Sequence, residues 1–116
     1  MKDDLVYIHH VLDAIIQIQK YAKNLTSKKF LRSQITKDAV IRQVTIIGEA
    51  SRRLSPDFQK NHPQVPWSQV IGMRNRLVHD YLGTDFGEVW RVVQEDLPTL
   101  KQQLRKILRD ARPKTE

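Results

Sequence analysis

The sequence contains no cysteine, so no disulfide can stabilise the fold, and a reducing cytoplasm suits the chain. No apolar run comes near the roughly 18 residues that a membrane-spanning helix requires. The first ten residues, MKDDLVYIHH, carry two acids and lack a small-residue cleavage site, which argues against a signal peptide. These absences exclude disulfide-stapled and membrane-spanning classes, and we expect a soluble, cytoplasmic protein that makes no membrane contact.

Acidic residues are also in short supply. The 116 residues include 13 Asp and Glu against 20 Lys and Arg, which gives a formal net charge of +7. This excess favours a polyanion or an acidic protein as the partner, without choosing between them. The composition, 40% hydrophobic and 28% charged, is that of a globular domain with one core. We expect a single domain over residues 1–110 and a basic tail over residues 111–116.

Strand-like alternation is nearly absent, whereas helical periodicity runs through most of the chain. Four main helices with short connections predict an all-α fold, an antiparallel bundle of four to five helices without an internal repeat or a second domain. The first helix should span about residues 4–24. Its apolar stripe comprises Leu5, Ile8, Leu12, Ile15, Ile16, Ile18 and Ala22.

The second helix should begin after Thr36, a residue type suited to an N-cap, with Asp38 in its first turn. Before it, the stretch LTSKKFLRSQI predicts a turn and one short helix. After it, the stretch SPDFQKNHPQVP holds three of the five prolines and predicts a loop. The apolar face of the second helix comprises Val40, Val44, Ile47 and Leu54.

The third helix should start at Pro66, because proline suits the first helical position, and should end near YLGTDFG. The fourth should run from about Phe86 toward the basic tail, with Pro98 kinking or splitting it. Its apolar positions are Val89, Val93, Leu97, Leu100, Leu104 and Ile107.

The third predicted helix carries the segment RNRLVHDY, residues 74–81. At about 100° per residue, Asn75 and His79 share one face, and Arg74 and Tyr81 share a neighbouring one. Arg74 falls in the middle of an apolar stripe, where a charge is costly unless it is paired. Each residue has an ordinary alternative: a snorkelling arginine, a helix-end histidine and a tyrosine at the edge of the core. Only the combination indicates a function. The stripe comprises Trp67, Val70, Ile71, Leu77 and Val78.

Cutting RNA without a metal requires a group that moves a proton and a cation that stabilises the phosphorane, and His79 and Arg74 supply these. On one straight helix the two residues lie about 140° apart around the axis and roughly 7.5 Å along it, an awkward match to one phosphate. Two copies of the helix packed across a two-fold axis would pool two of each residue in one cleft. We therefore expect a homodimer.

An arginine, four residues, a histidine, any residue and a tyrosine resemble the signature of the HEPN superfamily, specifically its HepT-like toxins. The blocks DAVIRQVTIIGEASRRL, HPQVPWSQVIGMRNRLVHDY and VWRVVQEDLPTLKQQL are similar to successive blocks of that family. The resemblance covers nearly the whole chain, from HHVLDAI to LRKIL. It implies an all-α HEPN fold, a homodimer with a composite ribonuclease site, and the toxin of a type VII-like toxin–antitoxin pair.

The resemblance also implies roles for the motif residues. Arg74 would hold phosphate and transition-state charge, His79 would transfer protons, and Asn75 would orient the phosphate. The implied partner is a minimal nucleotidyltransferase antitoxin that transfers AMP from ATP to Tyr81 and so blocks the RNA site. Asp80 beside the histidine must point away from RNA or help to set the histidine's pKa.

Several other residues have two interpretations. Glu49 could hold Arg74 or could pair along its own helix with Arg52 or Arg53, and the local pair is slightly favoured. Gly48 and Gly72 each cost about 1 kcal/mol inside a helix, so they indicate close approach of two helices rather than a phosphate loop.

The aromatic and histidine residues outside the motif have simple explanations. Trp67 and Trp90 sit at apolar positions and are expected in the core. His9 and His10 are consecutive and point about 100° apart, so we expect no metal site and no cofactor. The run KQQLRKILRDARPK is most simply a solvated face with a basic tail, although it could also steer RNA.

Two function classes remain. The leading one is a regulated ribonuclease toxin that cuts RNA, with tRNA as a candidate substrate, by 2′-hydroxyl attack that leaves a 2′,3′-cyclic phosphate. The alternative is a non-catalytic module whose dimer cleft binds a nucleotide or the nucleotidyltransferase.

Overall fold

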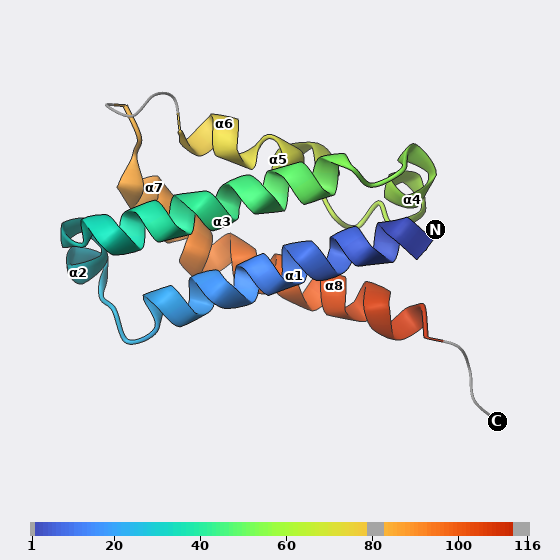
Figure 1. Ribbon diagram of the computed structural model, residues 1–116, viewed down its shortest axis with the longest axis horizontal. Coiled ribbons are helices and arrows are strands. Elements are labelled where there is room, and N and C mark those ends of the chain that lie inside the picture. The colour runs from blue at the N-terminus through green and yellow to red at the C-terminus, as the bar shows by residue number, and fades with distance from the viewer. Residues whose placement is uncertain (1, 79–82, 113–116) are drawn as a thin grey trace.

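In a computed structural model, the structure describes residues 2–78 and 83–112, and this part of the chain contains helices and no strand. The all-α fold expected from the sequence is confirmed. Figure 1 shows the elements in order. They are α1 (Lys2–Ala22), α2 (Ser27–Arg32), α3 (Gln34–Arg52), α4 (Pro56–Asn61), α5 (Trp67–Ile71), α6 (Met73–Leu77), α7 (Phe86–Arg91), a π-helical turn (Val92–Asp96) and α8 (Leu97–Asp110).

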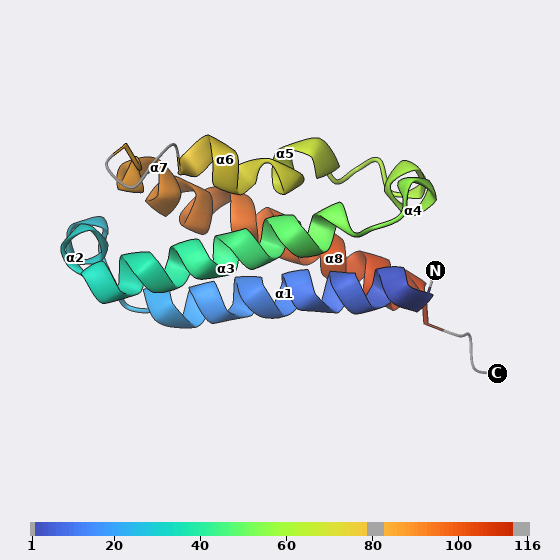
Figure 2. The ribbon, with the colours of Figure 1, turned by 45° about the horizontal axis from the view of Figure 1, so that its top comes forward.

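The long helices form an antiparallel bundle, as predicted. Helices α1 and α3 run side by side in opposite directions and make the most extensive contact in the molecule. Helices α5 and α6 lie along α3, and α8 packs against α1 (Figure 2). Within the described residues, no helix combines the length and the apolar character that a bilayer crossing demands.

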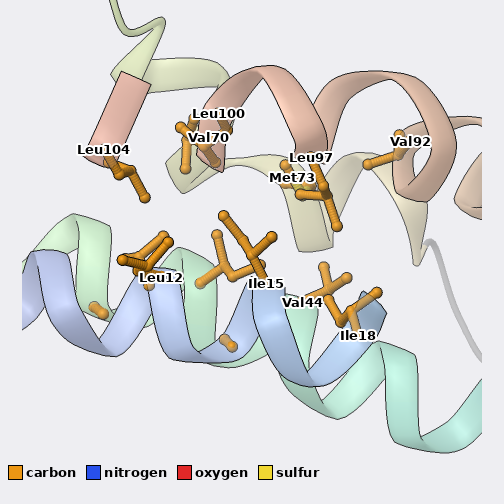
Figure 3. Packing of buried hydrophobic residues seen from close by; sticks show 14 of the residues in the cluster. Leu12, Ile15, Ile18, Val44, Val70, Met73, Val92, Leu97, Leu100 and Leu104 are labelled. Carbon is orange, nitrogen blue, oxygen red and sulfur yellow. The ribbon is translucent and has the colours of Figure 1, made fainter. Parts of the chain in front are cut away.

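The core forms where the apolar stripes of these helices meet (Figure 3). The predicted stripe of the first helix is largely confirmed. Its members are buried except for Leu5 and Ile16, which are partly buried. The predicted face of the second helix is buried throughout. Side chains labelled in Figure 3 come from α1 (Leu12, Ile15, Ile18), α3 (Val44), α5 (Val70), α6 (Met73), the π-helical turn (Val92) and α8 (Leu97, Leu100, Leu104).

The predicted start of the second helix is wrong by a few residues. Helix α3 begins at Gln34, and the N-cap is Ser33, whose hydroxyl accepts a hydrogen bond from the Thr36 N–H at 3.2 Å. Both residues are suitable caps, and Ser33 takes the position because α2 ends at Arg32 directly before it. The short helix predicted in LTSKKFLRSQI is confirmed as α2.

The loop predicted over SPDFQKNHPQVP is also wrong in its first half, which forms α4. Ser55 accepts a hydrogen bond from the Phe58 N–H at 3.2 Å, and Pro56 occupies the first turn, where its missing N–H costs nothing. Phe58 is buried, so tertiary packing anchors this short helix. The prolines of this stretch were interpreted as helix breakers, whereas Pro56 is the first residue of α4.

The split expected near Pro98 takes the form of a π-helical turn. The Leu97 N–H donates to the Val92 carbonyl, five residues back, and α8 then begins with Pro98 in its first turn. Proline cannot donate to a carbonyl four residues earlier, so the chain widens before it. The fourth predicted helix is therefore α7, the π-helical turn and α8.

A buried carboxylate ties the start of α1 to the start of α4. Asp4 is 3% exposed and accepts hydrogen bonds from the Ser55 N–H at 2.7 Å and from the Ser55 hydroxyl at 2.9 Å. Burial by itself raises the pKa of Asp4, whereas the hydrogen bonds from Ser55 are among the effects that lower it, and the net pKa lies below its ordinary value.

We predict that Asp4→Asn lowers the free energy of unfolding by about 1–2 kcal/mol at pH 7, because charge-assisted hydrogen bonds to Ser55 are lost. A lowered pKa stabilises the fold above the ordinary value of 3.8, and this contribution disappears as the pH falls below it. Urea unfolding between pH 7 and pH 3 should show the difference from wild type shrinking in acid. Asp3→Asn, at the exposed neighbour, is the control, and an equal effect there would refute the assignment.

Candidate functional site

The candidate site lies where α3 passes the junction of α5 and α6. A Cβ at position 48 would stand 3.1 Å from the carbonyl oxygen of Ile71, so any larger residue would push the two backbones slightly apart. The close approach predicted for Gly48 is confirmed. The same prediction for Gly72 is wrong, because a Cβ there would meet the Ser68 carbonyl of its own turn at 3.2 Å.

Gly72 instead breaks the third predicted helix. Pro66 is the residue before α5 rather than its first member, α5 ends at Ile71, and α6 ends at Leu77. The backbone at Val78 is extended, with φ −116° and ψ 95°. The motif therefore does not lie on one straight helix, and the 140° separation expected between Arg74 and His79 does not apply.

Arg74 lies exposed on α6, not within the apolar stripe as predicted. The break at Gly72 shifts the helical register, so Met73 and Leu77 become the buried residues of α6. The guanidinium Nε of Arg74 donates to the Thr45 hydroxyl at 3.1 Å. The Thr45 hydroxyl in turn donates to the Ile41 carbonyl at 3.0 Å, which fixes its orientation on α3.

Arg74 and Asn75 border one open hollow of about 330 Å³ between α3 and the α5–α6 junction. Glu49 and Arg52 border it from α3, so the hollow carries two guanidinium groups and one carboxylate. Among the described residues, Glu49 forms no ion pair with Arg52, Arg53 or Arg74. Arg74 donates a hydrogen bond to Thr45 instead. The described residues that line it are Thr45, Gly48, Glu49, Arg52, Ile71, Arg74 and Asn75.

The rest of the motif lies outside the described residues. These are the predicted proton-transfer residue His79, its neighbour Asp80 and the predicted modification site Tyr81. The structure brings Arg74 and Asn75 together at the hollow. Arg76 is also exposed on α6, but it borders a separate groove together with Asp96.

The acids that follow the motif are already paired. Arg91 bonds to Glu88 at 2.7 Å and to Asp96 at 3.1 Å. The hydrogen bond from Arg91 lowers the pKa of Glu88, and both carboxylates in turn raise the pKa of Arg91. Arg91 offsets the charge of only one of these two carboxylates, so the three residues together keep a net charge of −1.

Sequence reasoning missed Thr45 as the partner of Arg74. Thr45, Glu49 and Arg52 follow the i, i+4, i+7 spacing of one helix face, which is the signal that could have found it. Trp67 is buried as predicted, and Trp90 packs on Phe30 with ring centroids 5.0 Å apart. Nowhere in the described part of the chain do three or more His, Asp or Glu side chains gather as a metal ion would need.

Comparison with known proteins connects this geometry to a family. Residues 11–107 match the family model described as "Ribonuclease HepT-like". The chain is 38% identical over 101 residues to "Probable ribonuclease HepT" of Thermococcus cleftensis, an alignment that covers 87% of this chain and 92% of that protein. It is 34% identical over 103 residues to "Putative RNase MJ1380" of Methanocaldococcus jannaschii, covering 89% and 94%. No solved structure matches the chain.

A longer relative shares the same region. "Gamma-glutamylcyclotransferase and putative RNase MJ0434" of Methanocaldococcus jannaschii is 38% identical over 109 residues, which are 94% of this chain. The alignment covers 49% of that relative, so the chain spans about half its length.

We predict that Gly48→Val lowers the free energy of unfolding by about 1–3 kcal/mol, because the new side chain would press on the Ile71 carbonyl and separate α3 from α5. Chemical denaturation measures the change. Glu49→Val, at the adjacent exposed position, introduces the same side chain into the same helix and controls for helix propensity. Equal losses in the two variants would show that close approach does not explain Gly48.

Proposed function

The chain belongs to the HepT-like ribonuclease family of the HEPN superfamily, and from this premise we propose that it is a metal-independent endoribonuclease toxin that cuts RNA at a composite site in a homodimer. The observation that carries the proposal is the exposed Arg74, whose Nε is held at the edge of a hollow by a hydrogen bond to Thr45. A guanidinium anchored through Nε keeps its two Nη groups as donors, the fork that suits a phosphate. Within the described residues, these groups make no hydrogen bond.

In the proposed reaction, the 2′-hydroxyl of RNA attacks the adjacent phosphorus while the bond to the 5′-oxygen breaks. One histidine, His79, takes the proton from the 2′-hydroxyl, and a second copy gives a proton to the departing oxygen. Arg74 stabilises the charge that develops on the phosphorane, and Asn75 orients the phosphate. The products are a 2′,3′-cyclic phosphate and a 5′-hydroxyl, so neither water nor metal is consumed.

A homodimer supplies the second set of side chains. One chain offers one Arg74 and one His79, whereas an acid and a base are needed on opposite sides of the reacting phosphorus. A two-fold axis beside the motif would place both copies in one cleft.

We propose that a minimal nucleotidyltransferase antitoxin regulates the site in a type VII-like toxin–antitoxin pair. It would transfer AMP from ATP to the Tyr81 hydroxyl with release of pyrophosphate. The added nucleotide is bulky and negative, so it would both obstruct the cleft and offset the charge of Arg74 without any refolding.

We predict that the purified protein, freed of any partner, cleaves total tRNA in EDTA and leaves cyclic-phosphate ends. Arg74→Ala and His79→Ala should each lower kcat/KM by about 100-fold or more, because transition-state stabilisation and proton transfer are lost. Gel analysis of the cleaved RNA and mapping of its termini provide the measurement.

Each variant must remain dimeric by light scattering, so that loss of activity reports chemistry. Equal inactivity of wild type and both variants, with an intact mass that excludes AMP on the tyrosine, would contradict the ribonuclease proposal. That result would favour the non-catalytic binding module.

We predict that co-expression with a minimal nucleotidyltransferase adds AMP, taken from cellular ATP, to wild type but not to Tyr81→Phe, which lacks the acceptor hydroxyl. The intact mass of wild type should rise by one or more AMP groups with loss of RNA cleavage, whereas Tyr81→Phe should keep both its mass and its cleavage activity. Tyr21→Phe is the control at a tyrosine outside the motif. AMP on the Tyr81→Phe protein would show that the acceptor lies elsewhere.

A further inference from the structure

The positive charge of this protein is concentrated in one acid-free stretch. Residues 14–37 contain six Lys and Arg and no Asp or Glu, a net charge of +6. The whole chain carries +7, so the other 92 residues contribute only +1. The six cations are Lys20, Lys23, Lys28, Lys29, Arg32 and Lys37.

The fold gathers this stretch at one end of the bundle. It comprises the last turns of α1, all of α2 and the first turn of α3, and we call it the basic corner (Figure 1). In Figures 1 and 2 the same end of the molecule holds the end of α6, the helix that carries Arg74 and Asn75, and the start of α7, which follows the motif.

Packing fixes the basic corner beside the start of α7. The Phe30 ring of α2 lies 5.0 Å from the Trp90 ring and 6.4 Å from the Phe86 ring, both on α7. The Lys37 ammonium stands 4.8 Å from the centre of the Phe86 ring. Because the Phe30 ring is completely buried against these aromatic rings, it anchors α2 on α7.

The cations of the basic corner are available to a ligand. Five are exposed, Lys37 is partly exposed, and none pairs with an acid among the described residues. The nearest acids along the chain are Asp13 and Asp38, and neither forms an ion pair with these cations among the described residues, although Asp38 accepts a hydrogen bond from Gln34 at 2.8 Å. A cluster of solvated cations that outnumbers the neighbouring acids raises the local concentration of a polyanion.

The basic corner is also continuous with the candidate site. Lys37 precedes Thr45 by eight residues on α3, a distance of about 12 Å along the helix axis. Thr45 holds Arg74, so one helix connects the corner to the hollow where the phosphate would bind.

We infer that the basic corner binds the phosphate backbone of the RNA next to the cleaved bond and so positions the substrate. This inference rests on the proposed ribonuclease function and adds to it a binding surface outside the motif. Phosphate contacts of this kind fix register and contribute affinity, while leaving the chemistry to Arg74 and His79.

The test variant replaces Lys28, Lys29 and Arg32 of α2 with Gln. The matched control replaces Arg105, Arg109 and Arg112 with Gln; these are three exposed, unpaired cations at the opposite end of the bundle within the described residues. A second control, Lys28→Arg/Lys29→Arg/Arg32→Lys, changes the side chains but keeps the charge. Circular dichroism and light scattering establish that all three retain fold and assembly.

RNA binding is measured in the His79→Ala background with a labelled single-stranded oligoribonucleotide of mixed sequence at several salt concentrations. The α2 variant should bind about tenfold more weakly or worse in 100 mM salt. The slope of log K against log salt should fall in magnitude by about 2, since each single-strand contact contributes about 0.7. With His79 intact, the same substitutions should raise KM for tRNA and leave kcat nearly unchanged.

Normal binding by both controls and weak binding by the α2 variant would support the inference. Wild type could cleave tRNA while the α2 variant binds RNA as tightly as the Arg105/Arg109/Arg112 control. That result would overturn the inference but not the ribonuclease proposal. The basic corner would then be a surface for an acidic protein. If wild type neither binds nor cleaves RNA, both proposals fail together.

Discussion

The close approach of α3 to the α5–α6 junction is the constraint on which the candidate site depends. Gly48 has no side chain, so the Ile71 carbonyl can stand where a Cβ would be crowded at 3.1 Å. This contact places Thr45 beside Arg74, so the exposed arginine side chain is held by a hydrogen bond to the Thr45 hydroxyl. An anchored guanidinium has already lost much of its conformational freedom, so less entropy remains to be lost when it binds a phosphate.

Acidic and basic side chains near the motif differ in whether they have partners within the protein. Acids near the motif are occupied: Glu88 and Asp96 pair with Arg91, and Asp85 caps α7. Cations around the hollow and the basic corner are not paired among the described residues. Arg91 offsets one of its two carboxylate partners, and the six cations of the basic corner outnumber the acids that remain near the motif. The remaining positive field would attract RNA over a distance set by the ionic strength.

The sequence predicted helices well where periodicity was long and poorly where local signals competed. The stripes of α1 and α3 were read correctly because burial repeats every three to four residues over many turns. The start of α3 was missed because Ser33 and Thr36 are both good caps, and only the end of α2 selects the first. Helix α4 was missed because proline signals both a loop and a helix start, and the burial of Phe58 decides between them.

By itself, the sequence determined the all-α class, the core stripes, the family and the residue types of the motif, because periodicity and residue order are properties of the chain alone. Only the tertiary structure decided that the motif helix breaks at Gly72, that Arg74 is exposed rather than buried, and that Thr45 holds it. The reason is physical. A glycine's break and a hydrogen bond across 29 residues depend on which helices pack together, and packing is a property of the whole core.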